Sequence, residues 1–204
     1  MVREGIPFVL VPVLIAAGFG LIGWWPLSVV FATVAIFMLY FFRDPARIVP
    51  EGAGLIVSAA DGRVTRIEKD HNGFVVSVFL SPLDVHINRS PIAGRIREIN
   101  YTSGKKVPAT RDSASLVNER NTLIIDGEGL TVHCTQIAGI LARRIVCWPK
   151  AGDNLQRGQK FGLIKFSSRT DLLIPDTCEV LVAIGDRVIG GETVIAKVKE
   201  AKHQ

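Results

Sequence analysis

Directly before an apolar run, the chain reads Gly152-Asp-Asn-Leu-Gln-Arg-Gly158. The same pattern, G-D-x-[VL]-x-x-G, returns before a second apolar run as Gly185-Asp-Arg-Val-Ile-Gly-Gly191. Glycine and aspartate at fixed positions are typical of tight turns that lead into strands. The repeated pattern therefore predicts that this half of the chain is built from turns and short strands.

The rest of the chain after residue 54 supports the same fold class. Short apolar runs rich in β-branched residues alternate with Gly, Asp and Asn, which predicts a mainly antiparallel β domain. The expected strands are Leu55–Ser58, Arg63–Ile67, Gly73–Leu80, Thr122–Ile125, Leu130–Gln136, Lys160–Phe166 and Glu179–Ala183. The paired G-D turns resemble those of barrel-sandwich hybrids such as lipoyl and biotinyl domains, so the C-terminal part is expected to be barrel-sandwich-like. Three segments are less regular: a short helix or strand at Ile137–Arg144, and long loops at Pro82–Pro91 and Tyr101–Ala114.

The N-terminal part is different, because Ile6 to Phe42 is almost purely apolar with glycines, tryptophans and a proline near its middle. As helices, the halves Pro7–Ile22 and Leu27–Phe42 would each rise about 24 Å, short of the ~30 Å hydrocarbon core of a bilayer. The stretch is too long for a cleaved signal peptide, and no small-residue cleavage site follows it. We therefore predict a membrane-anchoring helical hairpin over residues 1–42. It either spans a thinned bilayer or enters one leaflet and returns.

A hairpin returns both of its ends to one side of the membrane. Arg3 precedes it and Arg43 and Arg47 follow it, so the positive-inside rule places residues 43–204 on the cytoplasmic side of the cell (inner) membrane. Three cysteines at irregular spacing fit a reducing compartment. The net charge of +5 lies on the part of the chain outside the hairpin. Such a basic surface, tethered to a bilayer, is attracted to anionic lipid headgroups. No nucleic-acid motif occurs, so no nucleic-acid partner is expected.

Three places in the β domain could carry chemistry. The first is Ser167-Ser168, because a serine in a tight turn can attack its own preceding carbonyl; an ordinary loop is the alternative. The second is His86, since histidine is the usual proton carrier near pH 7, although a lone histidine is more often structural. The third is Asp61 in Ser58-Ala-Ala-Asp-Gly-Arg-Val64, where aspartate also serves as a turn former. Arg169 and Asp171 flank the serines and could simply pair with each other.

Metal and nucleotide cofactors find no support in the sequence. His133 and Cys134 are adjacent, so they would face opposite ways in a strand, and no C-x-x-C or H-x-x-x-H spacing occurs. Neither G-x-G-x-x-G nor G-x-x-x-x-G-K-[ST] is present. No metal site and no nucleotide cofactor are therefore expected.

Taken in order, several segments resemble the short bacterial and archaeal phosphatidylserine decarboxylases. The resemblance covers most of the chain. It rests on the hydrophobic hairpin, Phe42-Arg-Asp-Pro-Ala-Arg47, Ala60-Asp-Gly-Arg63, Leu80-Ser-Pro-Leu-Asp-Val-His-Ile-Asn-Arg89, Asn118-Glu-Arg-Asn121, Gln136-Ile-Ala-Gly139 with Ala142-Arg-Arg-Ile145, and Phe161-Gly-Leu-Ile-Lys-Phe166 with Ser168-Arg-Thr-Asp171. No single segment is decisive, and their shared order carries the resemblance.

The resemblance implies a pyruvoyl enzyme made from an inactive precursor. Ser168 matches the serine that becomes the pyruvoyl group, so cleavage would leave a β chain ending at Ser167 and an α chain beginning at residue 168, which stay together. Asp61 and His86 match residues of self-cleavage or decarboxylation, with Asp61 orienting His86 to deprotonate Ser168. The pyruvoyl carbonyl would serve as electron sink, in the role that pyridoxal phosphate has elsewhere, so neither pyridoxal phosphate nor metal is expected.

Two features depart from the family. Ser167 stands where the family usually has glycine, which tolerates a strained turn better. A second histidine of longer members is missing, so His86 would serve both steps or Arg89 would bind phosphate.

The expected partners are the phospholipid substrate and the membrane, with Arg89, Arg143 and Arg144 as candidate anion-binding residues. A homodimer is left open, as are two other functions: a membrane-tethered barrel-sandwich adaptor and an uncleaved, inactive homologue.

Overall fold

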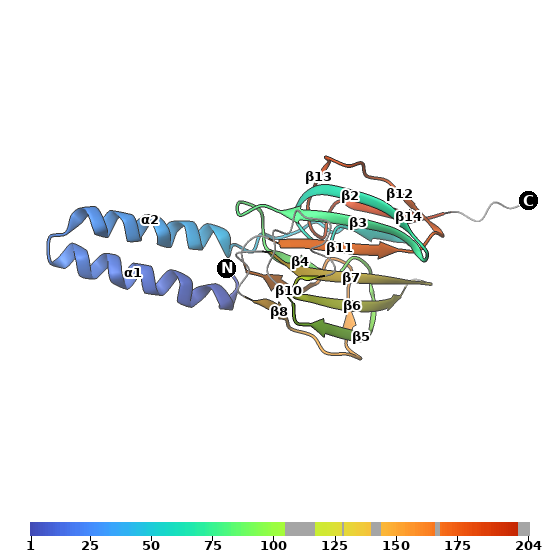
Figure 1. Ribbon diagram of the computed structural model, residues 1–204, viewed down its shortest axis with the longest axis horizontal. Helices are drawn as coiled ribbons and strands as arrows, with labels where there is room; N and C mark the ends of the chain where they lie inside the picture. Colours follow the sequence, from blue (N-terminus) through green and yellow to red (C-terminus); the bar gives the residue numbers. More distant parts are fainter. Residues whose placement is uncertain (105–116, 128, 140–143, 166–167, 200–204) are drawn as a thin grey trace, which may run out of the picture. The chain divides into compact units, whose positions relative to one another are not determined.

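The computed structural model describes residues 1–104, 117–127, 129–139, 144–165 and 168–199. The chain divides into two compact units, Met1–Ala46 and Arg47–Gln204. The first unit is helical and the second is built from strands (Figure 1). The predicted fold class, a mainly antiparallel β domain preceded by a helical hairpin, is therefore confirmed.

The first unit is a pair of antiparallel helices. After a 3-10 turn, η1 (Arg3–Gly5), it contains α1 (Ile6–Leu21) and α2 (Trp25–Phe41), close to the predicted halves. The chain reverses at Gly23, whose φ of +79° suits glycine best, and the Trp24 amide donates to the Phe19 carbonyl at 2.8 Å. Across the pair, the Ser28 hydroxyl donates to the Ala16 carbonyl at 2.8 Å. A polar group is thus satisfied inside an otherwise apolar hairpin.

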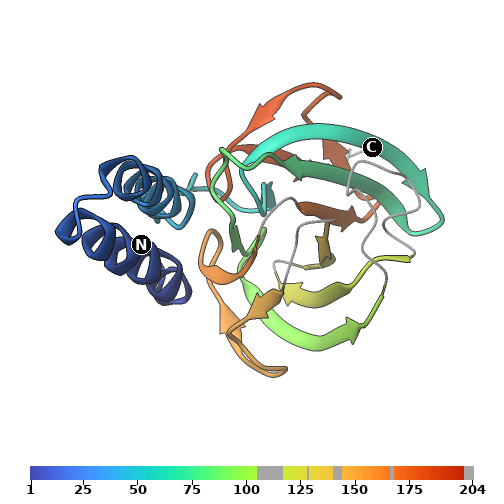
Figure 2. The same ribbon diagram turned by 60° about the vertical axis from the view of Figure 1, so that its left-hand side comes forward.

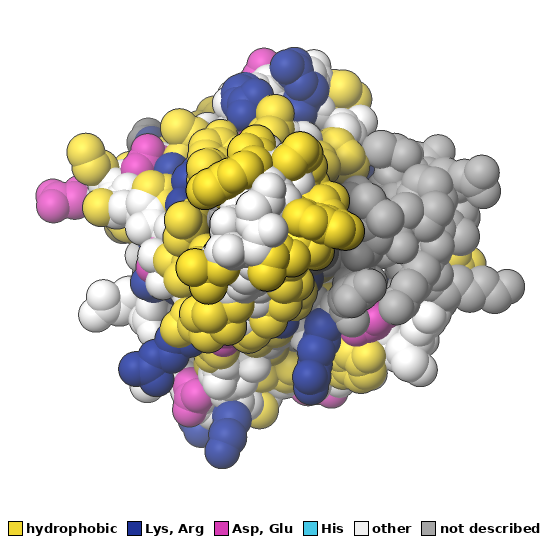
Figure 3. Space-filling model, turned by 90° about the vertical axis from the view of Figure 1, so that its left-hand side faces the viewer, with side chains coloured by type: hydrophobic (Ala, Val, Ile, Leu, Met, Phe, Trp, Pro, Cys, Tyr) yellow, Lys and Arg dark blue, Asp and Glu magenta, His cyan; other side chains and the backbone are white. Residues whose placement is uncertain are grey.

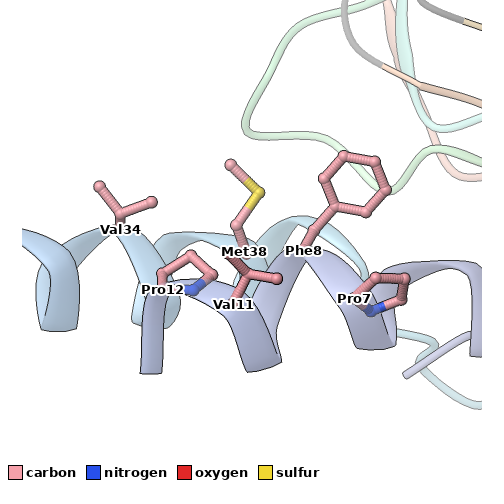
Figure 4. Close-up of a pocket in the computed structure, with 6 residues that line it drawn as sticks. All are labelled: Pro7, Phe8, Val11, Pro12, Val34 and Met38. Carbon is pink, nitrogen blue, oxygen red and sulfur yellow. The ribbon is translucent and has the colours of Figure 1, made fainter. Parts of the chain in front are cut away.

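The surface of this hairpin is apolar. Yellow side chains cover it in the space-filling view (Figure 3), and Leu21 is 89% exposed. Between the helices lies an apolar groove, lined by Pro7, Phe8, Val11, Pro12, Val34 and Met38 (Figure 4). The segment Arg3–Leu21 is long and apolar enough to cross a membrane, whereas Trp25–Phe41 is shorter. Such a surface is costly in water and suits a lipid environment, so the hairpin could anchor the protein.

The second unit contains fourteen strands among its described residues. The strands are β1 (Leu55–Val57), β2 (Gly62–Asp70), β3 (Gly73–Leu80), β4 (Ile87–Arg89), β5 (Gly94–Thr102), β6 (Arg120–Gly127), β7 (Leu130–Ala138), β8 (Ile145–Cys147), β9 (Asn154–Leu155), β10 (Lys160–Ile164), β11 (Ser168–Ile174), β12 (Cys178–Val180), β13 (Arg187–Val188) and β14 (Val194–Val198). Every strand expected from the sequence has a counterpart here.

These strands form three sheets. The largest has the order β13-β2-β3-β11-β7-β6-β5-β9, and it curls around the core (Figure 2). Two three-stranded sheets, β1-β14-β12 and β4-β10-β8, complete the unit. All pairs are antiparallel. The core between the sheets includes Ile56, Val76, Leu80, Ile96, Leu123, Ile125, Phe161 and Leu172.

The two G-D turns are confirmed as structural equivalents. The Gly152 amide donates to the Ile96 carbonyl at 2.8 Å, and the Gly185 amide donates to the Val64 carbonyl at 2.8 Å. At the other end of each turn, Gly158 and Gly191 have φ of +73° and +82°. The unit thus contains two similar halves, built around residues 58–64 with 185–191 and residues 90–96 with 152–158, whereas the repeated sequence pattern indicated only the two turns.

Two expected loops need correction, and one alternative that the sequence left open is decided in part. The expected loop Pro82–Pro91 contains the buried strand β4, which pairs with β10. The residues Ile137 and Ala138 belong to β7, so this end of Ile137–Arg144 is strand, and 140–143 lie outside the described residues. The expected loop Tyr101–Ala114 begins with the last two residues of β5, while 105–114 also lie outside the described part.

Candidate active site

Strand pairing brings His86 to the segment that contains the expected cleavage point. Ser168 pairs with Leu80 of β3, and the loop after β3 carries His86. That loop leads into β4, which pairs with β10 so that Ile87 lies opposite Leu163. The His86 carbonyl accepts a hydrogen bond from the Ile164 amide at 3.3 Å. His86 is therefore fixed next to the end of β10, and its loop starts opposite Ser168.

Ser168 is a buried serine at the first position of β11. Its exposed fraction is 0%, and its hydroxyl has no hydrogen-bond partner among the described residues. It also pairs with Ala138 of β7, whose carbonyl accepts a hydrogen bond from the Asn118 side-chain amide at 2.7 Å. Buried hydroxyls are normally bonded, and an exception requires a reason. A hydroxyl kept available for reaction is such a reason.

His86 is buried and held in one orientation. Its Nδ1 lies 3.0 Å from the Asp84 carbonyl, which can only accept, so Nδ1 carries the proton in the neutral ring and Nε2 is the basic nitrogen. The Asp84 carboxylate is fixed in turn by the Ser81 amide at 2.8 Å and by Arg187 at 2.6 Å. A histidine with a fixed tautomer is well suited to take or give a proton.

Asp61 is held by contacts from distant parts of the chain. Nη2 of Arg47 donates to its two oxygens at 2.9 and 2.7 Å, and the Gly190 amide donates to Oδ1 at 2.9 Å. Burial raises the pKa of Asp61, the Gly190 hydrogen bond and Arg47 oppose that rise, and the nearby Asp84 carboxylate adds to it. Orientation of His86 by Asp61 stays a prediction.

The second half of the unit shows that the Asp61 turn does not need a carboxylate. In one half, the Ser58 hydroxyl donates to the Ala60 carbonyl at 2.6 Å; in the other, the Ser90 hydroxyl donates to the Ile92 carbonyl at 2.7 Å. The equivalent of Asp61 in the second turn is Ala93. The sequence pattern S-x-x-x-G-R-[VI], which occurs at residues 58 and 90, could have revealed this duplication. The two turns therefore share the serine hydrogen bond, and only the Asp61 turn carries a carboxylate.

A chain of buried amides runs beside this site, and the sequence analysis did not foresee it. The Asn121 amide donates to Gln136 Oε1 at 3.1 Å, Gln136 Nε2 donates to Asn88 Oδ1 at 2.9 Å, and Asn88 Nδ2 donates to the Thr170 hydroxyl at 2.9 Å. Thr170 is two residues from Ser168 on β11, so both side chains lie on the same face of the sheet. The chain thus connects β6, β7, β4 and β11 under the candidate nucleophile.

The candidate anion-binding arginines differ in their surroundings. Arg89 is buried and donates to the Gly158 carbonyl at 3.1 Å. Arg144 is exposed, and its carbonyl accepts from the Lys165 amide at 3.2 Å, close to the end of β10. Arg143 and Ser167 lie outside the described residues. Arg187, which no sequence pattern indicated, has a side chain that is 69% exposed beside Asp84.

An ion pair lies beside Ser168 in the sequence, and possible metal ligands do not gather among the described residues. Arg169 and Asp171 pair with each other at 2.9 Å. Among the described residues, no group of three or more His, Cys, Asp or Glu side chains could hold a metal ion. Burial raises the pKa of the Cys134 thiol.

The β domain thus contains a buried serine and a fixed histidine, and comparison with known proteins identifies the class of the protein as carboxy-lyases. The family model described as phosphatidylserine decarboxylase matches residues 34–196. A phosphatidylserine decarboxylase proenzyme of Symbiobacterium thermophilum is 48% identical over 97% of this chain and 95% of its own length. One of Nitratidesulfovibrio vulgaris is 44% identical over 95% and 93%. The chain belongs to the phosphatidylserine decarboxylase family.

Proposed function

We propose that this protein decarboxylates phosphatidylserine to phosphatidylethanolamine with a pyruvoyl group, which forms from Ser168 when the chain cleaves itself after Ser167. One observation carries this proposal: the Ser168 hydroxyl is buried without a described partner, opposite the strand that leads to His86. Membership of the family supports the substrate class. The names of the relatives, which are proenzymes, support processing.

Self-cleavage needs only groups of this chain and water. His86 takes the proton of the Ser168 hydroxyl, whose oxygen attacks the carbonyl carbon of Ser167. The peptide C–N bond breaks, the released nitrogen takes up the proton, and an ester remains. Elimination then removes the Cα proton of residue 168 and breaks its Cβ–O bond, and the chain that ends at Ser167 leaves as a carboxylate. The dehydroalanine takes up water and releases ammonia, which leaves the pyruvoyl group.

The residues around Ser168 fit such a group and its reaction. A pyruvoyl group supplies an electron-withdrawing carbonyl, which takes up the electrons released with carbon dioxide. The backbone carbonyl of Asp84 keeps the proton of His86 on Nδ1, so Nε2 is the atom that exchanges protons with the reacting groups. Burial of Ser168 and His86 excludes bulk water from the product carbon. We assign the final proton transfer to His86.

Strand pairing also explains how the two chains would stay together. The α chain would begin with β11, which lies between β3 and β7 of the β chain. The later strands β12, β13 and β14 pair with each other or with β1 and β2. Every pairing of β11 is therefore with the other chain, and cleavage at residue 167 leaves these hydrogen bonds in place.

We propose that the hairpin holds the β domain at the cytoplasmic face of the inner membrane, where its lipid substrate lies. The apolar hairpin surface and the arginines at its ends support this placement. The substrate carries a phosphodiester and a carboxylate, so arginine should meet it. Of the two described candidates, Arg89 and Arg144, the second suits this role better, because Arg144 is exposed near the end of β10.

Purified wild-type protein should separate into two fragments on a denaturing gel, and the C-terminal fragment should resist Edman degradation and react with hydrazines. Ser168→Ala should give one full-length chain without activity. The matched control is Ser77→Ala, since Ser77 is also buried with a hydroxyl that lacks a described partner. Retained decarboxylation in Ser168→Ala would refute the role of this residue.

The same experiment distinguishes an active enzyme from an uncleaved homologue. Serine at position 167 has a narrower backbone range than glycine. A single full-length wild-type chain without a carbonyl group would contradict the mature-enzyme proposal. If Ser167→Gly then cleaves, the serine itself is the obstacle.

A further inference from the structure

The segment that follows the hairpin unit, residues 47–50, lies across the two G-D turns. The Ile48 amide donates to the Glu192 carboxylate at 3.0 Å, and Arg157 donates to the Pro50 carbonyl at 3.1 Å. Val49 lies between them and packs against Gly158. We call this segment the strap. Its contacts fix the backbone on the C-terminal side of Arg47.

Arg47 connects the strap to Asp61. Its Nη2 lies 2.7 Å from Oδ2 and 2.9 Å from Oδ1 of Asp61. The two side chains are only 9% and 15% exposed, so solvent screens their attraction far less than that of a surface pair. The Gly190 amide adds a third hydrogen bond to Oδ1. Three donated hydrogen bonds thus fix both oxygens of one carboxylate.

The charges around Asp61 make Arg47 the decisive partner. Two charged groups act on Asp61: Arg47 favours its ionised form, and Asp84 disfavours it. Burial disfavours the ionised form further. The charge of Asp84 is itself balanced by Arg187 at 2.6 Å. Removal of Arg47 would therefore leave a buried carboxyl next to another carboxylate.

We propose that Arg47 is a positioning residue for self-cleavage, which holds Asp61 ionised and correctly oriented beside the His86 loop. The inference rests on the proposed function. The positive-inside rule alone would explain Arg47 as a charge at the membrane surface, whereas the proposal assigns it a role in self-cleavage. It also means that the first residues after the anchor complete the machinery of the β domain.

The test is processing kinetics of the full chain, made by cell-free translation into lipid nanodiscs and followed by pulse-chase across a range of pH. Asp61 has a raised pKa, so its ionised form is lost as pH falls, and loss of Arg47 raises this pKa further. In a plot of cleavage rate against pH, Arg47→Met should move the midpoint of the acidic side to a higher pH, by about one pH unit or more. At pH values below both midpoints this corresponds to a roughly tenfold slower cleavage. High pH should restore much of the rate.

The matched control is Arg157→Met, which removes the other arginine that holds the strap but does not contact Asp61. It should keep the wild-type pH midpoint. Arg47→Lys keeps the charge without the planar guanidinium, so its midpoint should lie between those of wild type and Arg47→Met. Circular dichroism confirms that each variant is folded.

Equal pH midpoints for Arg47→Met and Arg157→Met would overturn the inference. If Arg47→Met does not fold, the comparison of Arg47→Lys with wild type decides: a raised midpoint supports the proposal and an unchanged one overturns it. A wild-type chain that never cleaves would instead overturn the proposed function, so the two failures can be told apart.

Discussion

Replacement of Asn88 by alanine should strongly destabilise the β domain, because this side chain is the centre of the buried amide chain. It is 0% exposed, accepts from Gln136 at 2.9 Å and donates to Thr170 at 2.9 Å. In Asn88→Ala, Gln136 Nε2 keeps only the Val146 carbonyl at 3.4 Å. The Thr170 hydroxyl loses its donor.

Each buried group left without a good partner costs about 1–3 kcal/mol. The two groups, together with the cavity, should lower the free energy of unfolding by about 3–5 kcal/mol. For a domain of this size, the melting temperature falls by about 2–4 °C per kcal/mol. We therefore expect a decrease of roughly 6–20 °C.

The assay is thermal unfolding by circular dichroism in mild detergent, in the Ser168→Ala background so that one uncleaved chain unfolds. The control is Asn100→Ala, since Asn100 is an exposed asparagine on β5 and should change the free energy of unfolding by only about 0.5 kcal/mol. If both variants melt within a few degrees of each other, the amide chain contributes little and the reasoning is refuted.

Three further predictions concern other parts of the structure. Gly191→Ala should destabilise the β domain more than Gly185→Ala in chemical denaturation: both glycines have positive φ, but a Cβ at Gly191 would lie 2.8 Å from Cδ of Arg89, whereas Gly185 faces open space. Equal effects would contradict this contact. Cys134 should resist alkylation in the folded protein, because it is buried and burial raises the pKa of its thiol; rapid labelling before unfolding would show that the core opens. Trp24 and Trp25 are exposed at the hairpin turn, so brominated lipids should quench their fluorescence in vesicles if the hairpin enters a bilayer; bromines near the far interface should quench best if it spans.

The sequence was sufficient for the features that depend on local pattern. The apolar run of residues 6–42 predicted the two helices, and β-branched runs such as Gly73–Leu80 predicted strands. The repeated G-D turns predicted two equivalent turns because glycine and aspartate occupy the same positions in both. These signals are local, since each depends on residues that are neighbours along the chain.

The rest of the site depends on contacts between distant residues. Asp61 and Gly190 are separated by 129 positions, and Asn88 and Thr170 by 82. No periodicity marks such pairs, so the sequence identified Asp61 as a candidate without its partners. It also placed Ser168 in a turn, whereas the serine begins a strand, because the pairing of β11 with β3 and β7 is a property of the whole sheet.

The position of β11 in the middle of the largest sheet affects how the protein could refold before and after cleavage. A precursor folds as one chain, so β11 finds its neighbours in a unimolecular reaction. Once the bond before Ser168 is cut, unfolding would release two separate pieces, and refolding would become a second-order encounter that depends on concentration. The missing peptide bond cannot be remade by folding. Before cleavage, the protein can unfold and refold reversibly. After cleavage, its lifetime would be set by the unfolding rate, and enzyme lost by denaturation would have to be replaced by new synthesis.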